Sequence, residues 1–302
     1  MIKNAQKTIY GLLLAILKNL FGKDAVKKFD AKLRFGRELD LKNPKTLADK
    51  VVYLENHCCN DLTSRCTDKW EVREYVREKG LENILVPVYG SVWNNVDQLD
   101  FNDFPDKFVL KATHGCKMNY LCADKKKLDQ VECKREINRW LKSTYGAYSC
   151  EWHYTQIPHR YYCEQYLGNS SEMIDYKIHC LNGRPEFILV CSERVSNANK
   201  GMKVTLDLFD TKWEAIDGLC TSGDEVPGKG NIKKPSQLNV MLDIAKKLSS
   251  DFDFVRVDLY EIQGKVYFGE LTFTPANGVF PYFTKDFLGK MGKKLSLKVG
   301  EK

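Results

Sequence analysis

Two alternating stretches near the C-terminal end constrain the fold of this chain more than any other feature. Residues 254–260 alternate between apolar and polar side chains, with Arg256 and Asp258 in the polar set. Because successive side chains of a β-strand point to opposite faces, this pattern predicts a strand with one buried face and one polar face. Residues 266–272 are again strand-like and follow Gln263-Gly264-Lys265, a stretch typical of a turn. The sequence therefore predicts a β-hairpin over 254–272.

The length of the turn decides which residues of this hairpin face one another. A three-residue turn over 263–265 places Asp258 directly opposite Glu270. It also places Arg256 opposite Thr272, two positions further from the turn. Directly opposed residues in an antiparallel pair have Cβ atoms about 5 Å apart, so the two carboxylates would lie side by side.

The same register puts alternate residues of the return strand on one face of the hairpin. These are Val266, Phe268, Glu270 and Thr272. A two-residue turn would shift the register and pair Asp258 with Gly269, which would separate the two carboxylates. The predicted site therefore depends on the three-residue turn.

The opposed carboxylates of Asp258 and Glu270 would be stabilised by a cation between them. Two ionised carboxylates this close repel each other, which raises the pKa of one of them. A hard divalent cation removes the repulsion, and Mg²⁺ binds one or two carboxylates together with phosphate oxygens and water. Arg256, on the same face, could hold a phosphate through two parallel hydrogen bonds. The hairpin thus indicates a magnesium and phosphate site, and the alternative is an ordinary sheet face exposed to solvent.

Two lysines elsewhere in the chain are suited to bind phosphate. Lys111 ends the apolar stretch Phe108-Val-Leu-Lys111, and Ala112-Thr-His-Gly115 follows as a turn whose backbone N–H groups could hold an anion. Lys69 lies at the predicted start of a helix. The alternative for both is a lysine in solvent. Glu164, a lone acid within an apolar strand, is most simply an edge residue.

The rest of the chain mixes helical and extended patterns, which predicts an α+β fold with antiparallel sheets. Helices are expected over 1–55 with a break near 42–44, over 68–79 and 129–145, and from 235 onward. Strands are expected at 87–93, 107–112, 160–166, 176–180 and 186–191. Asn182-Gly183, between the last two strands, is typical of a two-residue hairpin turn. Residues 221–234, rich in Gly, Lys and Pro, are expected to form a loop.

Composition and length are those of a globular protein. Hydrophobic residues make up 43% and charged residues 29% of the 302 residues, which excludes collagen-like and disordered classes. The longest apolar run, Ile9–Leu17, is too short to cross a bilayer, which needs about 20 residues. Eleven cysteines occur without a CxxC pair or a secretory signal, so we expect reduced thiols in a cytoplasmic protein.

Positive charge is concentrated at the two ends. The formal net charge is +7, and residues 1–50 alone hold twelve Lys or Arg against five Asp or Glu. Basic ends on a slightly acidic body do not predict a nucleic-acid surface, which needs a basic stripe on the folded domain.

The first helix combines apolar residues at helical spacing with lysines, namely Ile9, Leu13, Ile16, Leu17 and Leu20 with Lys3, Lys7 and Lys18. Such a helix could contact an anionic inner-membrane surface peripherally. The interpretation we favour is a helix packed on its own domain with a solvated basic face.

Several motifs together resemble the TupA-like branch of the ATP-grasp superfamily, which is found in bacterial surface-polysaccharide gene sets. The resemblance covers about residues 43–283 and depends on the order and spacing of short segments. These segments are Asn43-Pro-Lys-Thr46, Asp68-Lys-Trp-Glu-Val-Arg-Glu-Tyr75, Phe108-Val-Leu-Lys-Ala-Thr-His-Gly115, Glu151-Trp-His-Tyr154, Asp175-Tyr-Lys177, Arg256-Val-Asp-Leu-Tyr260 and Phe268-Gly-Glu-Leu-Thr-Phe273. The resemblance implies an ATP-grasp fold, in which two α+β subdomains with antiparallel sheets sandwich ATP.

The resemblance also divides the chain into five segments. We expect a basic helical segment over 1–55 and the N-terminal part of the ATP-grasp unit over 56–106. Residues 107–170 would form the subdomain with the phosphate loop and the adenine hinge, and 171–284 the subdomain with the metal hairpin. Residues 285–302 would form a basic tail.

Roles for individual residues around ATP and Mg²⁺ follow from the same resemblance. The expected contacts with the nucleotide phosphates are Lys69, Lys111 and the loop residues His114, Gly115 and Lys117, the last at a position where Gly is usual. The expected adenine hinge is Glu164 to Leu167, with main-chain atoms of Gln165 and Leu167, and the expected ribose contact is Glu172 or Asp175. Asp258 and Glu270 would hold Mg²⁺ with Thr272, which replaces the usual Asn, and Arg256 would contact the transferred phosphate. Candidate substrate contacts are His114, Lys177 and Arg194, whereas His153 and His179 are expected to be structural.

The activity that the resemblance implies is ADP-forming carboxylate–amine ligation through an acyl phosphate. The carboxylate would be a uronic acid or amino acid of a capsule or cell-wall polymer precursor, free or polymer-linked. Two alternatives remain open: a phosphotransferase acting on a sugar hydroxyl, and a non-catalytic ATP-binding protein of a surface-polymer assembly. Lys117 and Thr272 favour the second alternative, because both depart from the usual pattern.

Overall fold

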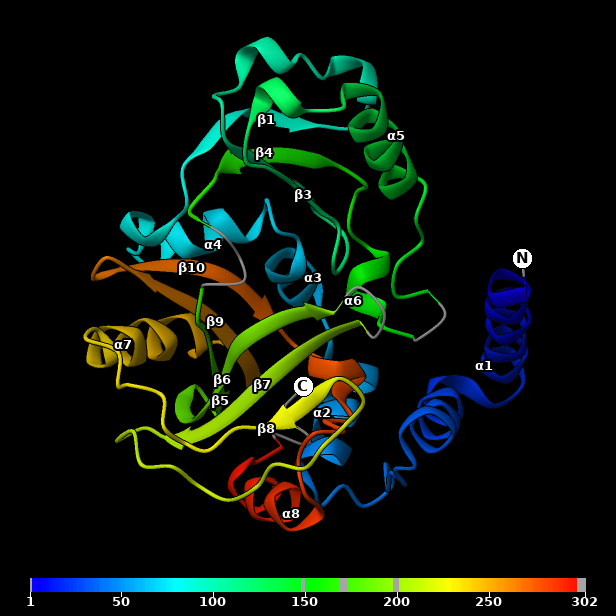
Figure 1. The fold of residues 1–302 in the computed structure, drawn as a ribbon. Coiled ribbons are helices and arrows are strands. Elements are labelled where there is room, and N and C mark those ends of the chain that lie inside the picture. The colour runs from blue at the N-terminus through cyan, green and yellow to red at the C-terminus, as the bar shows by residue number, and fades with distance from the viewer. Residues whose placement is uncertain (1, 148–149, 169–172, 198–200, 298–302) are drawn as a thin grey trace.

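The computed structural model describes residues 2–147, 150–168, 173–197 and 201–297, and it shows an α+β fold built on two β-sheets (Figure 1). The helices are α1 (Ile2–Phe35), α2 (Leu47–Cys58), α3 (Asp61–Thr67), α4 (Val72–Glu78), α5 (Gln130–Leu141), α6 (Trp152–Thr155), α7 (Leu238–Ser249) and α8 (Lys285–Lys294). The strands are β1 (Val88–Trp93), β2 (Phe108–Ala112), β3 (Asn119–Cys122), β4 (Tyr161–Gln165), β5 (Asp175–Leu181), β6 (Arg184–Asn197), β7 (Gly201–Asp210), β8 (Glu225–Pro227), β9 (Phe254–Ile262) and β10 (Lys265–Thr272). Short 3₁₀ turns join several of these elements.

The small sheet, at the top of Figure 1, has four antiparallel strands in the order β1-β4-β2-β3. One face packs on α5 and forms a core that includes Phe108, Leu110, Cys163, Ile137 and Trp140. The opposite face carries Lys111, Tyr162 and Glu164, and the Tyr162 ring contacts Trp70 just before α4. In the strands expected at 107–112 and 160–166, successive side chains therefore lie on a core face and on a face that carries charge.

The large sheet has six strands in the order β10-β9-β5-β6-β7-β8, antiparallel except for the β7–β8 pair, which is parallel. One face forms a core with α4 and α7 that includes Val255, Val257, Leu259, Ile178, Ile188, Met241 and Leu248. The other face is divided along the strands. Its apolar half packs on α2 and α8 through Phe187, Leu189, Phe254 and Phe287. The polar half carries Asp175, Lys177, Arg256 and Asp258.

The segment before α4 links the two sheets. The Asp68 carboxylate accepts hydrogen bonds from the backbone N–H groups of Trp70 and Glu71 (2.8 and 3.2 Å), as expected of a residue at a helix start. The same carboxylate accepts a hydrogen bond from Arg160 at the beginning of β4 (2.8 Å). The Lys69 N–H donates to the Thr113 carbonyl (3.1 Å). These contacts attach the segment to the small sheet, and α4, which follows it, packs in the core of the large sheet.

The turn of the last hairpin has two residues, not the predicted three. Lys265 pairs with Ile262, and both Gln263 and Gly264 have positive φ (52° and 76°), which is typical of a tight hairpin turn. With a regular ladder this register would have paired Asp258 with Gly269. The predicted three-residue turn is therefore wrong.

A β-bulge in β10 nevertheless restores the predicted pairs. The register shifts between Phe268 and Glu270, after which Glu270 pairs with Asp258 and Thr272 with Arg256. The extra residue in the bulge also reverses which side chains of β10 point to each face of the sheet. Val266 and Phe268 lie in the core with the apolar face of β9, so the prediction that they share a face with Glu270 and Thr272 is wrong.

The glycine at the bulge is required by close packing. A Cβ atom built on Gly269 would lie 3.0 Å from the Asp258 carbonyl oxygen and 2.9 Å from the Tyr260 ring. The first of these is a backbone atom that cannot move aside without changing the ladder. Gly269 therefore holds β9 and β10 close enough for the shifted register.

Helix α1 differs from the interpretation that we favoured. It is interrupted at Gly22, whose backbone is not helical (φ 81°, ψ 178°), and its first half projects from the body at the right of Figure 1. Leu14 is buried with Val26 and Cys150, but Ile9, Leu13, Ile16 and Leu20 are exposed. Four of the five apolar residues expected to pack on the domain thus face outward, and only Leu17 packs against the buried cluster. No helix among the described residues is long and apolar enough to span a membrane.

Three further differences concern which residues form helices, strands and the small sheet. Residues 285–294, expected within a basic tail, form α8, whose Phe287, Leu288 and Met291 pack in the core. Strands β3 and β7 were not predicted, and α5 is shorter than the expected 129–145. Strand β1 belongs to the small sheet, so that sheet begins well before residue 107.

A buried contact between Lys27 and Glu55 joins α1 to α2. The Lys27 ammonium lies 2.6 Å from a Glu55 carboxylate oxygen, and both side chains are almost fully buried. Burial raises the pKa of Glu55 to about 8, because the opposing attraction of Lys27 is smaller than the desolvation of the carboxylate. Glu55 therefore holds a proton in the folded state at pH values where an exposed glutamate would have lost it.

The raised pKa of Glu55 predicts a pH-dependent stability. Between about pH 4.5 and 8 the folded state binds a proton that the unfolded state has released, so the free energy of unfolding falls as the pH rises. Denaturant unfolding across this window should give a slope of stability against pH that is more negative in the wild type than in Glu55→Gln. Glu38→Gln, which changes an exposed carboxylate, is the matched control and should follow the wild type. Equal slopes in the wild type and Glu55→Gln would contradict the assignment.

Gly269 gives a second prediction. Gly269→Ala should lower the free energy of unfolding by about 1–3 kcal/mol, because the new methyl group collides with the facing strand. Gly289→Ala on α8, where a Cβ meets no atom within 4 Å, is the matched control and should be neutral or slightly stabilising. Urea unfolding of the two variants measures the difference, and equal stabilities would show that the bulge does not need glycine.

Candidate functional site

The polar half of the large sheet holds a compact ion cluster. Arg256 donates two hydrogen bonds to Asp258, from Nε to Oδ1 (2.6 Å) and from Nη2 to Oδ2 (2.7 Å). Lys177, directly opposite Asp258 on β5, contacts Asp258 (2.5 Å) and Asp175 (2.6 Å). The cross-strand register of β5 and β9 therefore brings two cations and two carboxylates together.

The hairpin extends this cluster to Glu270 and Thr272. Arg256 Nη2 donates to Thr272 Oγ1 (2.9 Å) and to Glu270 Oε1 (3.2 Å), and the Thr272 hydroxyl donates to the same Glu270 oxygen (3.1 Å). The Asp258 side chain is 2% exposed and that of Glu270 is 36% exposed. Glu270 is thus the carboxylate of this pair that a ligand can reach directly.

The cations of the cluster remain charged despite their burial. Burial and the nearby Arg256 lower the pKa of Lys177, but the carboxylates of Asp175 and Asp258 outweigh them, and its pKa lies well above the usual value. Burial also opposes the charge of Arg256, and Asp258 outweighs it in the same way. The site consequently keeps two fixed positive charges at any physiological pH.

The small sheet contributes a second ion pair. Lys111 on β2 forms a salt bridge with Glu164 on β4, and the Tyr162 hydroxyl donates weakly to the same carboxylate (3.4 Å). Glu164 is buried, and β4 lies inside the sheet, so the simple interpretation of Glu164 as an edge residue is wrong. The side chains of Lys111 and Glu164 share the sheet face that is turned away from α5.

Lys69 connects the two halves of the site. Its ammonium group donates to the Gly115 carbonyl in the β2–β3 loop (2.7 Å) and lies 3.8 Å from Glu270 Oε2 on the large sheet. Lys69 is therefore held between the sheets and is not a lysine in open solvent.

His114 has a structural place in the loop after β2. Its side chain is buried, its Nε2 atom lies 2.9 Å from the Trp140 carbonyl oxygen, and its ring stacks on His159. Burial lowers the pKa of His114 to about 4, so the ring is neutral. The side chain expected to touch the substrate is thus directed into the packing of α5, and only its backbone remains in the loop.

Cys116 and Lys117, further along this loop, are exposed. Lys117 has a φ of 61°, in the left-handed region where glycine is favoured, which agrees with the expectation that Gly is usual there. Gly115 packs so closely on Met118 that a Cβ atom would lie 2.7 Å from its sulfur. The loop is therefore compact, and Lys117 is accommodated with backbone strain.

The remaining predicted residues are only partly placed. Glu172 lies outside the described residues, and nothing can be said of the Arg194 side chain on β6. The Gln165 N–H at the end of β4 donates to the Pro87 carbonyl (2.9 Å), and Leu167 is half-buried just beyond it. Asp175, expected near the ribose, contacts Lys177.

Two histidines are structural, as expected. His153 and His179 are buried, and burial lowers the pKa of each, to about 3 for His153. His179 stacks on Phe187 (ring centroids 4.3 Å apart). Both rings are therefore neutral.

The sequence analysis missed the aromatic pair of Trp70 and Tyr162, whose ring centroids are 5.6 Å apart beside Lys69 and Glu164. The alternation of 160–166 puts Tyr162 on the same face as Glu164, which could have identified one of the two. Trp70 could not have been identified, because its position depends on the contact between the segment before α4 and the small sheet.

The donor set of the site fits magnesium. Asp258, Glu270 and Thr272 offer only oxygen atoms, which Mg²⁺ prefers. In the described parts of the chain, no group of three or more His, Cys, Asp or Glu side chains is arranged to hold a metal ion by itself. A metal at this site would therefore need oxygen atoms from a ligand as well, and Mg²⁺ commonly binds together with substrate phosphates.

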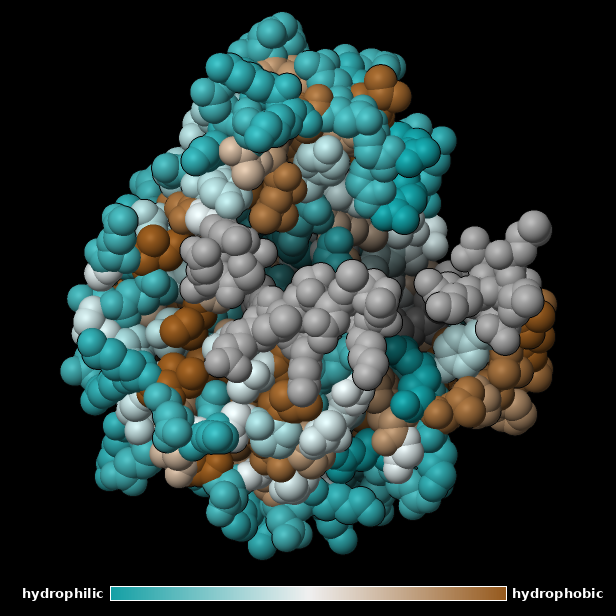
Figure 2. Space-filling view, in the orientation of Figure 1, coloured by the Kyte–Doolittle hydropathy of each residue, from teal (hydrophilic) through white to brown (hydrophobic). Residues whose placement is uncertain are grey.

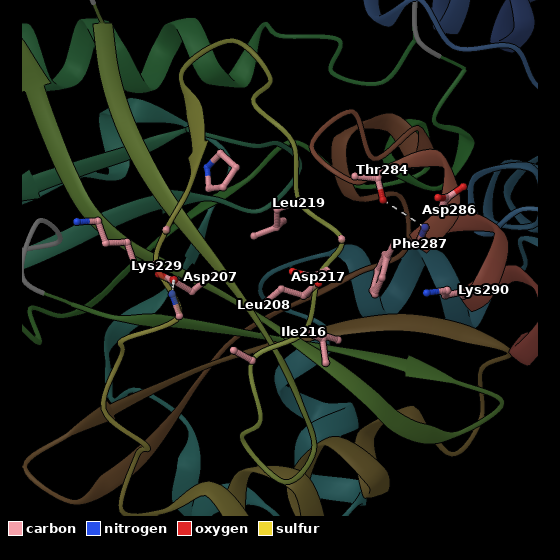
Figure 3. Close-up of a pocket in the computed structure, with 15 residues that line it drawn as sticks. Asp207, Leu208, Ile216, Asp217, Leu219, Lys229, Thr284, Asp286, Phe287 and Lys290 are labelled. Atoms are coloured by element: carbon pink, nitrogen blue, oxygen red, sulfur yellow. Dashed lines mark hydrogen bonds between the residues drawn. The ribbon is translucent and has the colours of Figure 1, made fainter.

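A separate cavity of about 530 Å³ lies between the β7–β8 edge of the large sheet and α8 (Figure 3). Its charged lining consists of Asp207, Asp217, Asp286, Lys229 and Lys290. None of the predicted nucleotide or metal residues lines it, so it is distinct from the ion cluster.

Comparisons with known proteins identify one family and several structures of similar fold. A model of the TupA-like ATPgrasp family matches residues 50–296, whereas no curated protein sequence matches the chain. Among solved structures, D-alanine–D-alanine ligase from Helicobacter pylori aligns at 15% identity over 76% of this chain and 61% of that chain, with a TM-score of 0.42. L-amino acid ligase from Bacillus licheniformis aligns at 13% identity over 85% and 56%, with a TM-score of 0.44. The chain thus spans less than two thirds of the length of these ligases.

The strained loop residue gives a prediction that is independent of any ligand. Lys117→Gly should raise the free energy of unfolding by about 1 kcal/mol, because glycine adopts a positive φ without a steric penalty. Lys117→Ala removes the same charge but keeps the Cβ atom, and it should leave the stability near that of the wild type. Urea unfolding distinguishes the two, and an equal gain in both variants would attribute the effect to charge.

Proposed function

Because this chain belongs to the TupA-like ATP-grasp family, we propose that it is an ATP-dependent ligase that joins a carboxylate to an amine and releases ADP. The observation that carries the proposal is the position of Lys69, between the Gly115 carbonyl of the small sheet and Glu270 of the large sheet. A cation held between two sheets, with Lys111 on one and Arg256 on the other, suits the phosphates of a nucleotide.

The charge balance of the site supports binding of ATP together with a divalent metal. Lys69, Lys177 and Arg256 contact the carboxylates of the large sheet, and Lys111 contacts Glu164. These cations are therefore already largely neutralised, whereas a triphosphate carries several negative charges. Additional positive charge must accompany it, and Mg²⁺ is the usual source in phosphoryl-transfer sites.

We propose that Glu270 and Thr272 bind this Mg²⁺ directly, and that Asp258, the third expected ligand, supports them through its contacts with Arg256 and Lys177. Glu270 is the accessible carboxylate, and Asp258 keeps Arg256 and Lys177 in place beside it. The bound ion would neutralise negative charge on the phosphate oxygens. The departure from the usual Asn at Thr272 leaves a hydroxyl, which is still an oxygen donor.

In the proposed reaction, a carboxylate oxygen of the substrate attacks the γ-phosphorus of ATP, and the bond to ADP breaks. The amine nitrogen then attacks the carbonyl carbon of the acyl phosphate, phosphate leaves, and the amine releases its proton. The chain itself supplies position and charge: Arg256 and Lys69 would hold the transferred phosphoryl group, and Lys111 the remaining phosphates. Their ion pairs fix these side chains before ATP arrives, which limits reorganisation during the reaction.

The rest of the nucleotide would lie at the end of β4. There the Gln165 carbonyl and the main chain of Leu167 would face adenine, since the Gln165 N–H is bonded to Pro87. Asp175 or Glu172 would contact the ribose. Lys117 would lie near the phosphates, although the neighbouring His114 side chain is turned away.

For the substrates, we propose a uronic acid or an amino acid of a surface-polymer precursor, joined to an amine in the cytoplasm. The TupA-like family context supports this class, and Arg194 is a candidate contact for an anionic acceptor. Lys177, which contacts Asp175 and Asp258, would orient the cluster rather than bind the substrate.

A second function is favoured by two specific residues. The strained Lys117 and the hydroxyl at Thr272 would both suit a protein that binds ATP without turning it over. A phosphotransferase that uses the same ATP site is the other alternative. Trapping with hydroxylamine separates it from a ligase, because only an acyl phosphate yields a hydroxamate.

The decisive variant is Glu270→Gln. It should lower ADP release by about 100-fold or more in the presence of ATP, Mg²⁺ and a panel of uronic acid and amino acid pairs, because it removes the accessible anionic ligand. Glu261→Gln, an acid on the same hairpin that contacts Ser236 and Gln237 instead, is the matched control and should keep its activity. Equal turnover in the two variants would refute the metal assignment, and no ADP release from wild type with any pair would favour the binding protein.

A further inference from the structure

Exposed apolar side chains are concentrated on the first half of α1. In the described residues, six of the large hydrophobic side chains that are exposed lie there: Ile9, Leu12, Leu13, Ile16, Leu20 and Phe21. Five of them recur at three- and four-residue spacing, from Ile9 to Leu20, so they form one stripe along the helix. Figure 2 shows hydrophobic residues gathered on this helix, at the right of the view. We call these six residues the α1 stripe.

The opposite side of the helix is attached to the body. Leu14 is buried with Val26 and Cys150, and Tyr10 and Leu17 pack against this small cluster. Since that contact determines which side faces inward, the α1 stripe points away from the rest of the chain. The helix is therefore apolar on two sides, and only one of them is covered.

The charge of this segment indicates what could cover the stripe. Residues 1–23 contain Lys3, Lys7, Lys18 and Lys23 and no Asp or Glu. Two copies of such a helix packed together would bring like charges close to one another, which opposes self-association. An anionic lipid surface offers both an apolar phase for the stripe and negative charge for the lysines.

The length of the segment fits a helix in the plane of the membrane. From Ile9 to Phe21 the helix rises by about 18 Å, at 1.5 Å per residue, whereas the hydrocarbon core is about 30 Å thick. In addition, no described helix qualifies as a membrane span. The stripe is therefore suited to lie at the interface, with its apolar side chains among the acyl chains.

We propose that the α1 stripe docks this protein onto an anionic membrane surface. The break at Gly22 ends the docking segment, and the part of α1 beyond it stays anchored through Lys27 and its neighbours. The proposal does not depend on the ligase assignment, since it uses none of the nucleotide-site residues.

The test is sedimentation of the full chain with vesicles. Vesicles of phosphatidylcholine containing phosphatidylglycerol should bind the protein, vesicles of phosphatidylcholine alone should bind it much more weakly, and added salt should weaken binding. Leu12→Glu with Ile16→Glu should abolish binding, because it places two charges at positions that are 63% and 47% exposed. Lys3→Gln with Lys7→Gln should weaken it by about fivefold for each lysine removed.

A matched control is Val131→Glu on α5, which places a charge at a side chain that is 81% exposed and far along the chain from α1. It should bind vesicles as the wild type does. Circular dichroism should show folded protein for every variant, since the changed apolar side chains are exposed.

Two outcomes would overturn the proposal. One is a failure of the wild type to bind the anionic vesicles. The other is a dimer in sedimentation-velocity runs that Leu12→Glu with Ile16→Glu converts to monomer, because the stripe would then be covered by a second copy.

Discussion

The one-residue bulge at Gly269 is the constraint on which the polar half of the large sheet depends. Before the bulge, β10 directs apolar side chains into the core, and after it, Glu270 and Thr272 face Asp258 and Arg256. With the same two-residue turn and no bulge, the carboxylate of Glu270 would enter the core, where an unpaired charge is very unfavourable. One glycine thus lets Leu271 stay in the same core as Phe268 while Glu270 and Thr272 face the ion cluster.

The ion cluster built on this hairpin is stable only as a set. Removing one partner of a buried ion pair leaves an uncompensated charge, which is more harmful than losing both. Asp258 is the centre of the set, because it contacts both Arg256 and Lys177. The contacts within the cluster therefore fix the direction of each side chain. A lysine exposed on the surface without such contacts would not be held in one direction.

Short apolar stretches and turn signals predicted most strands, and alternation predicted the polar face of β9, because one face of that strand is buried. The pairing of Asp258 with Glu270 was also predicted, but for a wrong reason: the turn is one residue shorter than expected, and the bulge compensates. Gly269 within a strand pattern was the available signal. The burial of His114 could not be predicted, since it depends on the packing of α5. Nor could the pattern of α1 say whether its apolar stripe is covered.

The position of Lys69 has a consequence if the proposed nucleotide site is correct. Its ammonium group donates to the Gly115 carbonyl in the β2–β3 loop and lies close to Glu270. A ligand that binds this ammonium group must provide contacts that replace those of Lys69 with Gly115 and Glu270. Adenosine and AMP lack the outer phosphates and would offer no group to replace these contacts. The protein would then discriminate among adenine nucleotides by the length of the phosphate chain.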